Sequence, residues 1–211
     1  ETNVSTVIVV TGASRGIGKA IALSLAAPDT ALIINCSKSA GRLELVKKEI
    51  IKKGALCETF VGDVSNYSTV NEMFDLAISI YGKVNVLINN AGIASIGLFQ
   101  DMTPDMWNNI MSVNLNSVYN CCHFAVQDML RRHCGKIINI SSVWGLYGAS
   151  CEVAYSATKG AINSFTKALA KELAPSNIQV NAIACGAIDT EMNGHLSPEE
   201  LQELAEEIPC G

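Results

Sequence analysis

Short runs of β-branched and apolar residues alternate with longer helical segments along the whole chain, and this alternation constrains the fold more than any other feature. Helical patterns lie at about 16–27, 40–53, 67–81, 104–132 and 152–174. Strand patterns precede, separate and follow them at 6–10, 31–36, 56–61, 84–88, 136–140 and 178–184. Apolar strands separated by helices form a parallel sheet covered on both faces. We therefore predict one doubly wound α/β domain over residues 1–211.

Composition excludes several classes of protein. The apolar runs are far shorter than the roughly 20 residues needed to cross a bilayer, and no secretory signal opens the chain, so we expect a cytoplasmic protein without a membrane span. Fifteen basic against twenty acidic residues give a net charge of -5, which argues against nucleic acid as a partner. The eight cysteines form no CxxC pair and no metal-like spacing, so we expect reduced thiols and no metal site.

A glycine-rich turn follows the first strand. It reads TGASRGIG over residues 11–18 and leads into an alanine-rich helix. A turn this tight needs glycine, and it brings backbone N–H groups and a helix N-terminus towards a phosphate group. A purely structural turn between a strand and a helix would look the same, but the position after the first strand favours a nucleotide site.

The end of the second strand indicates which nucleotide binds. A carboxylate there would accept hydrogen bonds from a ribose 2′-hydroxyl and would repel a 2′-phosphate. This chain has Asn35, Cys36, Ser37 and Lys38 instead. Since Ser37 or Lys38, together with Arg15, could hold the phosphate, we predict NADP(H) rather than NAD(H). Ordinary solvated loop cations are the alternative.

Two further segments follow strands three and four. Asp63 and Val64 follow the third strand, where the carboxylate could accept a hydrogen bond from an adenine amino group. The fourth strand leads into NNAG at residues 89–92, whose small residues allow close approach of the backbone to a cofactor. Each segment could equally be a simple turn.

Tyr155 and Lys159 lie one helical turn apart and therefore project from the same face of a predicted helix. An ammonium group beside a phenol stabilises the phenolate, so we expect Lys159 to lower the pKa of Tyr155 from about 10. The fifth strand ends at Ser142, on the sheet edge where such folds bind ligands. Asn114 is a polar residue within an apolar stretch of a long helix and could simply be a satisfied interior amide.

Taken together, TGASRGIG, NNAG and YSATK resemble the motifs of the short-chain dehydrogenase/reductases, in family order and over essentially the whole chain. The resemblance implies a Rossmann-like fold and a catalytic tetrad of Asn114, Ser142, Tyr155 and Lys159. Tyr155 would donate a proton to a substrate carbonyl, Ser142 would hold that oxygen, Lys159 would also bind the nicotinamide ribose, and Asn114 would support a water relay. The cofactor-binding residues would be Gly12, Ser14, Arg15, Gly16, Ile17, Gly18, Ser37, Asp63, Val64, Asn90, Ala91, Gly92, Tyr155, Lys159, Ile188 and Thr190.

One position departs from the family pattern. Cys185 stands where the family usually has proline, so we expect a looser loop with a thiol near the cofactor.

Within the family, the chain is most similar to the 3-oxoacyl-[acyl-carrier-protein] reductases. The similar segments include NISSVWGLYG and LSPEELQELAEEIP. That resemblance implies reduction of a 3-oxoacyl thioester in fatty acid synthesis, and an acidic carrier protein would need a basic docking site such as Arg131, Arg132 and Lys136. These cations could instead only complement a helix dipole. One alternative is a dehydrogenase or reductase that acts on a sugar alcohol, a steroid-like compound or another small carbonyl or alcohol. A non-catalytic NADP(H)-binding sensor is a second alternative.

Two expectations concern the last part of the chain and its assembly. Residues 189–207 are predicted to form a lid with a helix starting near Ser197, and Met192, His195 and Leu196 would shape the substrate pocket. The resemblance further implies a homotetramer packed through the helices at 104–132 and 152–174. Because the family continues for another helix and a seventh strand, we expect this chain to lack the family's last strand.

Overall fold

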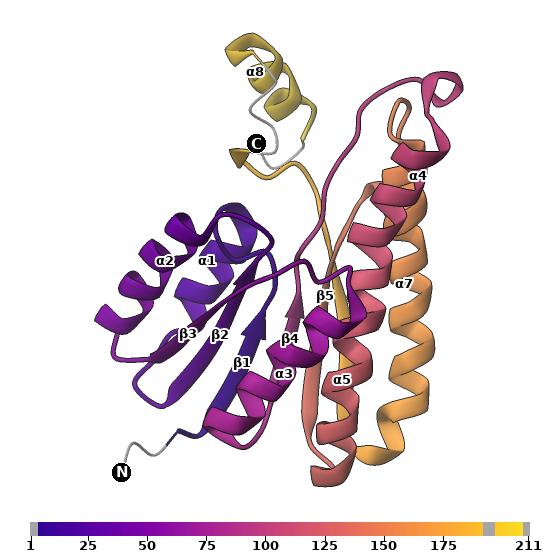
Figure 1. Ribbon diagram of the computed structural model, residues 1–211. Helices are drawn as coiled ribbons and strands as arrows, with labels where there is room; N and C mark the ends of the chain where they lie inside the picture. Colours follow the sequence, from indigo (N-terminus) through magenta and orange to yellow (C-terminus); the bar gives the residue numbers. More distant parts are fainter. Residues whose placement is uncertain (1–3, 192–196, 209–211) are drawn as a thin grey trace.

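Six parallel strands form one sheet in the order β3-β2-β1-β4-β5-β6. The computed structural model describes residues 4–191 and 197–208. Figure 1 shows this sheet with α1 and α2 on one face and α3, α5 and α7 on the other. The strands are β1 (Thr6–Val10), β2 (Thr30–Cys36), β3 (Leu56–Val61), β4 (Val86–Asn89), β5 (Gly135–Ser142) and β6 (Ile178–Cys185). The predicted doubly wound α/β fold is confirmed, with strand boundaries within two residues of those expected.

The helices follow the predicted segments with one important difference. They are α1 (Gly16–Leu25), α2 (Ala40–Lys52), α3 (Tyr67–Tyr81), α4 (Pro104–Met111), α5 (Ser117–Arg132), α6 (Trp144–Tyr147), α7 (Val153–Leu173) and α8 (Pro198–Glu207), with short 3-10 turns at Phe99–Asp101 and Ala174–Ser176. The prediction of one α-helix over 104–132 is wrong, because a π-helical turn at Ser112–Asn116 separates α4 from α5. A π-turn inserts an extra residue and changes the direction of the side chains within it.

The two faces of the sheet carry separate apolar cores, because successive side chains of a strand point to opposite faces. Val9 of β1 packs with residues of α3, α5 and α7, whereas its neighbours Ile8 and Val10 pack with residues of α1 and α2. This explains why β1 is apolar at every position from Val7 to Val10. On the α1 side, strands β4 to β6 also form an open apolar hollow beside α1, lined by Ile88, Ile138, Ile140 and Ile183 among others.

The strand order places the carboxyl ends of β1 and β4 next to each other, although helices leave them towards opposite faces. Such a switch point opens a crevice at the carboxyl edge, which is where ligands of these folds bind. Among the described helices, none is long and apolar enough to cross a membrane. The seven described cysteines are all free thiols.

Candidate active site

The glycine turn between β1 and α1 is closed so tightly that only glycine fits at two of its positions. Gly12 has a φ of +64°, and a Cβ there would lie 2.9 Å from the Cα of Ala91. A Cβ at Gly18 would lie 2.2 Å from the carbonyl oxygen of Gly12. Helix α1 begins directly after its N-cap residue Arg15, whose side chain forms no capping hydrogen bond. Its first N–H groups are thus available to a phosphate, as the nucleotide interpretation requires.

Asn90 joins this turn to the loop after β4. Its side-chain amide donates to the carbonyl oxygens of Thr11 and Gly12 at 3.2 and 3.0 Å. In return, the Thr11 hydroxyl accepts from the backbone N–H groups of Asn90 and Ala91 at 3.1 and 3.0 Å. These four hydrogen bonds therefore fix the NNAG segment to the glycine turn, and the Asn90 side chain donates two of them.

Tyr155, Lys159 and Ser142 meet at the carboxyl end of β5. Tyr155 and Lys159 lie in the first two turns of α7, and the Lys159 ammonium lies 5.5 Å from the centre of the Tyr155 ring. The same ammonium donates to the carbonyl oxygen of Ile140 at 2.8 Å. Ser142, the last residue of β5, forms a side-chain hydrogen bond with Tyr155. The structure thus brings together three of the four predicted catalytic residues.

Close packing of α6 on α7 fixes the position of these residues at the carboxyl end of β5. A Cβ at Gly145 would lie 2.6 Å from the carbonyl carbon of Lys159, so a larger residue would push α6 away from α7. The Ser142 hydroxyl also accepts from the backbone N–H of Trp144 at 3.2 Å, which orients Ser142 from the same short helix.

Asn114 lies in the π-turn and is fully buried. Its amide exchanges two hydrogen bonds with the backbone of Ile93, at 2.8 and 2.9 Å, and donates to the Thr158 hydroxyl at 3.2 Å. A Cβ at Gly92 would lie 3.3 Å from the Asn114 amide oxygen and 3.8 Å from the Lys159 nitrogen. Asn114 is therefore both a satisfied interior amide and a neighbour of Lys159. Thr158 is a residue of this site that the motifs did not indicate.

Burial dominates the acid–base properties of this site. It raises the pKa of Tyr155 above its ordinary value of 10, and the hydrogen bond from Ser142 only partly opposes this. Burial also lowers the pKa of Lys159 from 10.5 to about 8. The expectation that Lys159 lowers the pKa of Tyr155 is therefore wrong, because the net change is an increase. The physical reason is that the phenol is desolvated while the ammonium is bonded to the Ile140 carbonyl.

Cys185 ends β6 and is paired in register with Ser142. Burial raises the pKa of its thiol, while the charge of Lys159 lowers it to a smaller extent. The net increase makes the thiolate scarcer near neutral pH than in an exposed cysteine.

The loops after β2 and β3 close the other end of the crevice. The buried Asn35 amide donates to the carbonyl oxygens of Phe60 and Gly62 at 3.1 and 3.0 Å. Asp63 accepts from the backbone N–H of Ser65 at 2.9 Å, so one of its carboxylate oxygens is already used in a turn. Ser37 is exposed at the end of β2. No carboxylate stands there, as the sequence indicated.

Arg15 of the glycine turn shares an acidic partner with a second arginine. Arg15 and Arg42, from the first turn of α2, both donate to one carboxylate oxygen of Glu191, at 3.0 and 2.8 Å. Arg42 and Glu191 were not predicted as site residues. Thr190 lies over Gly16, where an added Cβ would be 3.7 Å from its side chain, and Ile188 is largely exposed.

The predicted helix after Ser197 is confirmed as α8, whose first turn is closed by a capping box between Ser197 and Glu200. Met192, His195 and Leu196 lie outside the described residues.

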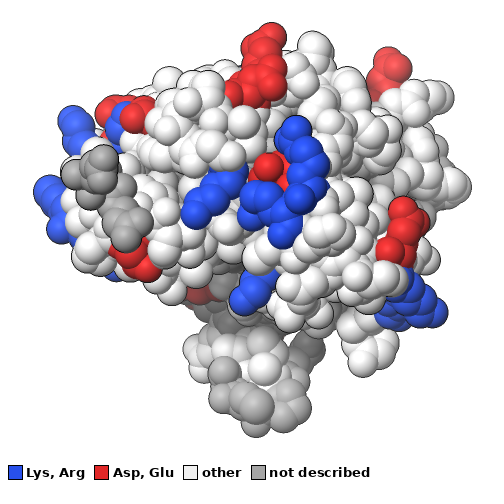
Figure 2. Space-filling model, turned by 90° about the horizontal axis from the view of Figure 1, so that it is seen from below, with Lys and Arg blue, Asp and Glu red and all other residues white. Residues whose placement is uncertain are grey.

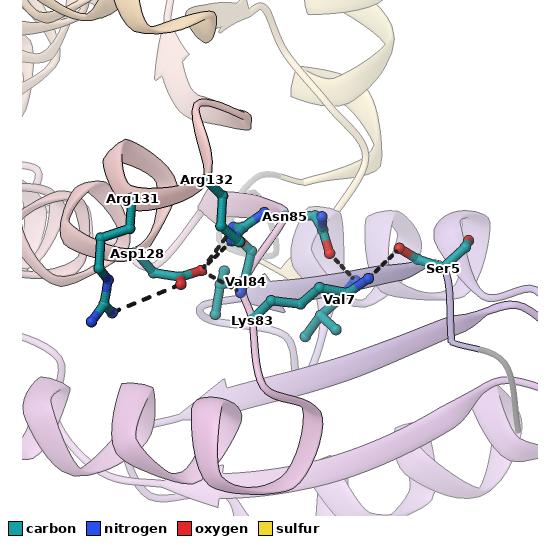
Figure 3. A network of polar contacts seen from close by, with 8 residues as sticks. All are labelled: Ser5, Val7, Lys83, Val84, Asn85, Asp128, Arg131 and Arg132. Carbon is teal, nitrogen blue, oxygen red and sulfur yellow. Dashed lines mark hydrogen bonds and ion pairs between the residues drawn. The ribbon is translucent and has the colours of Figure 1, made fainter. Parts of the chain in front are cut away.

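The predicted basic docking cluster lies at the opposite end of the sheet. Figure 2 shows the face at the amino ends of the strands, with several basic residues gathered around an acidic group near its centre. Figure 3 shows that Arg132 is bound to Asp128 and Val84, while Arg131 reaches Asp128 only at 3.8 Å. Asp128 also accepts from the backbone N–H of Val84 at 3.0 Å. Arg132 is thus largely used to fasten α5 to the segment before β4.

No group of three or more His, Cys, Asp or Glu side chains that could hold a metal ion occurs within residues 4–191 and 197–208.

Comparisons with known proteins identify the family of the chain. The family model described as short chain dehydrogenase matches residues 6–201. The 3-oxoacyl-[acyl-carrier-protein] reductase FabG of Staphylococcus epidermidis is 38% identical over 200 residues, which cover 95% of this chain and 82% of that protein. A 3-oxoacyl-[acyl-carrier-protein] reductase of Synechocystis is 38% identical over 198 residues, covering 94% of this chain and 80% of the relative.

A comparison with solved structures shows a similar fold. A dehydrogenase/reductase from Sinorhizobium meliloti superposes with a TM-score of 0.90 at 28% identity, covering 100% of this chain and 84% of that one. With its sheet order, its glycine turn and its Ser142, Tyr155 and Lys159 cluster, the chain belongs to the short-chain dehydrogenase family, whose members are oxidoreductases that act on CH–OH groups with a nicotinamide cofactor.

Proposed function

We propose that this protein is an NADPH-dependent reductase of 3-oxoacyl thioesters, with acyl-carrier-protein-bound substrates as in the relatives' names. The observation that carries the proposal is the meeting of Ser142, Tyr155 and Lys159 beside the glycine turn. The residues present suit a dinucleotide, because Gly12 and Gly18 permit a tight turn directly before the N-terminus of α1, where the N-cap residue Arg15 forms no side-chain capping hydrogen bond.

The family resemblance implies the roles of the four residues. Bound NADPH supplies the hydride that is added to the carbonyl carbon. The Tyr155 phenol donates a proton to the carbonyl oxygen, and the Ser142 hydroxyl donates a hydrogen bond to the same oxygen and fixes its position. Lys159 binds the nicotinamide ribose. Asn114 binds the Ile93 backbone and would support a water relay that resupplies the proton.

The preference for NADP(H) rests on charge at the end of β2. Asn35, Cys36 and Ser37 provide no carboxylate that would repel a 2′-phosphate, and Arg15 lies at the adjacent turn. The free thiols of the described cysteines support a reducing compartment, in keeping with a cytoplasmic enzyme.

A substrate panel tests the proposal. The oxidation of NADPH and of NADH is followed with an acetoacetyl thioester, with small sugars and with steroid-like ketones. We expect the thioester with NADPH to give the highest kcat/KM. A higher kcat/KM for a sugar or a steroid-like ketone would replace the proposed substrate, and tight NADPH binding with no turnover would favour a sensor.

Carrier docking is a separate part of the proposal. The exposed Arg131 and Lys136 favour an acidic partner. However, Lys136 is the second residue of β5 and Ser142 is the last, which separates them by about 20 Å at the usual rise of a strand. The double variant Arg131→Ala/Lys136→Ala should leave the reduction of a small thioester unchanged. A tenfold lower kcat/KM for a carrier-bound thioester alone would assign docking to this cluster, and unchanged values would place it elsewhere.

We also propose a homotetramer, as the family resemblance implies. Met106 of α4 and Tyr119 and Leu130 of α5 are large apolar residues that are exposed in the single chain, which supports a contact through these helices. Light scattering coupled to size-exclusion chromatography tests it, and a monomeric mass at micromolar concentration would exclude it.

A further inference from the structure

The segment that follows β6 crosses the carboxyl edge of the sheet. β6 lies at one end of the strand order, whereas the glycine turn belongs to β1 and α1. Figure 1 shows the chain beyond β6 above this edge, with α8 further on. Within this segment Thr190 lies over Gly16 and Glu191 reaches Arg15 and Arg42. The segment therefore contacts the cofactor crevice at the end remote from Tyr155.

The guanidinium groups of Arg15 and Arg42 form a site of two positive charges, and the Glu191 carboxylate occupies it. They come from the turn after β1 and from the first turn of α2, and they converge on the same carboxylate oxygen of Glu191. All three side chains are about half exposed, so each ion pair contributes little to the stability of the fold. The two hydrogen bonds hold the pKa of Glu191 below its ordinary value, so this carboxylate is ionised at neutral pH.

The location of the pair indicates which ligand anion it suits. The turn after β1 receives the pyrophosphate in folds of this type, and the residues after β2 contact the adenosine ribose. Arg15 and Arg42 stand on these two segments. A phosphate ester on the 2′ position of that ribose offers nearly two negative charges and three acceptor oxygens, compared with the single charge of a carboxylate.

We propose that Glu191 is an internal competitor for the 2′-phosphate of NADP(H), and that Arg42 is a specificity-determining residue for this phosphate alongside Arg15. The carboxylate and the phosphate require the same two guanidinium groups. Binding of NADP(H) therefore separates Glu191 from both arginines, whereas NAD(H), which has no 2′-phosphate, leaves the contact in place. The inference rests on the proposed use of NADP(H) and does not depend on the identity of the carbonyl substrate.

Glu191→Gln tests the competition, because it keeps the size of the side chain and removes its charge. Dissociation constants for NADP⁺ and NAD⁺ are measured by calorimetry on the full chain without substrate. We expect Glu191→Gln to tighten NADP⁺ binding by about fivefold, since an exposed ion pair no longer has to be broken, and to leave NAD⁺ binding unchanged within about twofold. Glu203→Gln on α8, an exposed position beyond the same segment, is the matched control and should change neither constant.

Arg42→Gln completes a double-mutant cycle. It should weaken NADP⁺ binding by about tenfold without affecting NAD⁺, and it should reduce the effect of Glu191→Gln. Equal NADP⁺ affinities for the wild type and Glu191→Gln, or an equal gain for NAD⁺, would overturn the competition.

The design separates this inference from the proposed function. If the binding changes occur as expected but no 3-oxoacyl thioester is reduced, the proposed substrate fails and the competition stands. If NADP⁺ binds more tightly than NAD⁺ but Glu191→Gln changes nothing, the competition fails and the proposed cofactor stands. If NADP⁺ binds no more tightly than NAD⁺ in every variant, both the cofactor preference and the inference are refuted.

Discussion

Replacing Lys159 by methionine should stabilise the ligand-free protein while removing its activity. Lys159 is 5% exposed, and burial lowers its pKa from 10.5 to about 8. At about 1.4 kcal/mol per pKa unit, holding this lysine charged in the folded state costs about 3 kcal/mol at neutral pH. Methionine keeps the apolar stem but leaves the carbonyl oxygen of Ile140 without the donor at 2.8 Å, which costs about 1 kcal/mol. The expected net gain is about 2 kcal/mol.

The gain should depend on pH in a defined direction. Because the folded-state pKa of Lys159 is depressed, the unfolded chain binds more protons than the folded one between about pH 8 and 10.5. The stability of the wild type therefore rises with pH in this range, relative to a variant that lacks the group. The advantage of Lys159→Met should be fully present below about pH 8 and should shrink to near zero by about pH 9.5.

Urea unfolding of both proteins at about pH 7 and pH 9.5 measures this difference. Lys171→Met, an exposed lysine of the same helix, is the matched control and should shift stability by less than about 0.5 kcal/mol at either pH. A loss of stability in Lys159→Met at pH 7, or a difference that is the same at both pH values, would refute the assignment of burial as the dominant influence on Lys159.

Two further substitutions test the scaffold and the cofactor turn. Asp128→Asn should lower the free energy of unfolding by about 2–3 kcal/mol, because it leaves the partly buried Arg132 without its carboxylate partner. Arg131→Ala is the control and should change the free energy of unfolding by less than about 0.5 kcal/mol. Equal effects of the two substitutions in urea unfolding would contradict this prediction. Gly18→Ala should abolish NADP⁺ binding, since its Cβ would lie 2.2 Å from the Gly12 carbonyl oxygen, while Gly41→Ala, which meets nothing within 4 Å, should bind normally in calorimetry.

The fold could be predicted because its determinants are local in sequence. Apolar strands covered on both faces produce runs such as residues 6–10, and the turn signals between them mark the helices. The glycine turn and the spacing of Tyr155 and Lys159 are also local, since four residues on a helix place two side chains on one face.

The π-turn could not be predicted, because it depends on a contact distant in sequence. Asn114 bonds to the backbone of Ile93, 21 residues away, and to the hydroxyl of Thr158. The extra residue at Ser112–Asn116 turns the Asn114 side chain towards these partners. The apolar pattern of residues 104–132 alone is equally compatible with one uninterrupted α-helix.

The electrostatics of the site also required the structure. A tyrosine and a lysine one turn apart suggest mutual attraction, but the pattern does not reveal that both are desolvated. The pairing of Arg42 with Glu191 joins residues 149 positions apart. A second arginine shortly after β2 was the only signal for it, and surface helices commonly carry such residues.

The central claim is that Tyr155 donates the proton in carbonyl reduction, and one measurement tests it most directly. The rate of NADPH oxidation with an acetoacetyl thioester is compared in the wild type and in Tyr155→Phe, with NADPH affinity measured separately by calorimetry. We predict that Tyr155→Phe binds NADPH within about twofold of the wild type and loses about three orders of magnitude in kcat. Turnover within about tenfold of the wild type, at undiminished NADPH affinity, would contradict the mechanism.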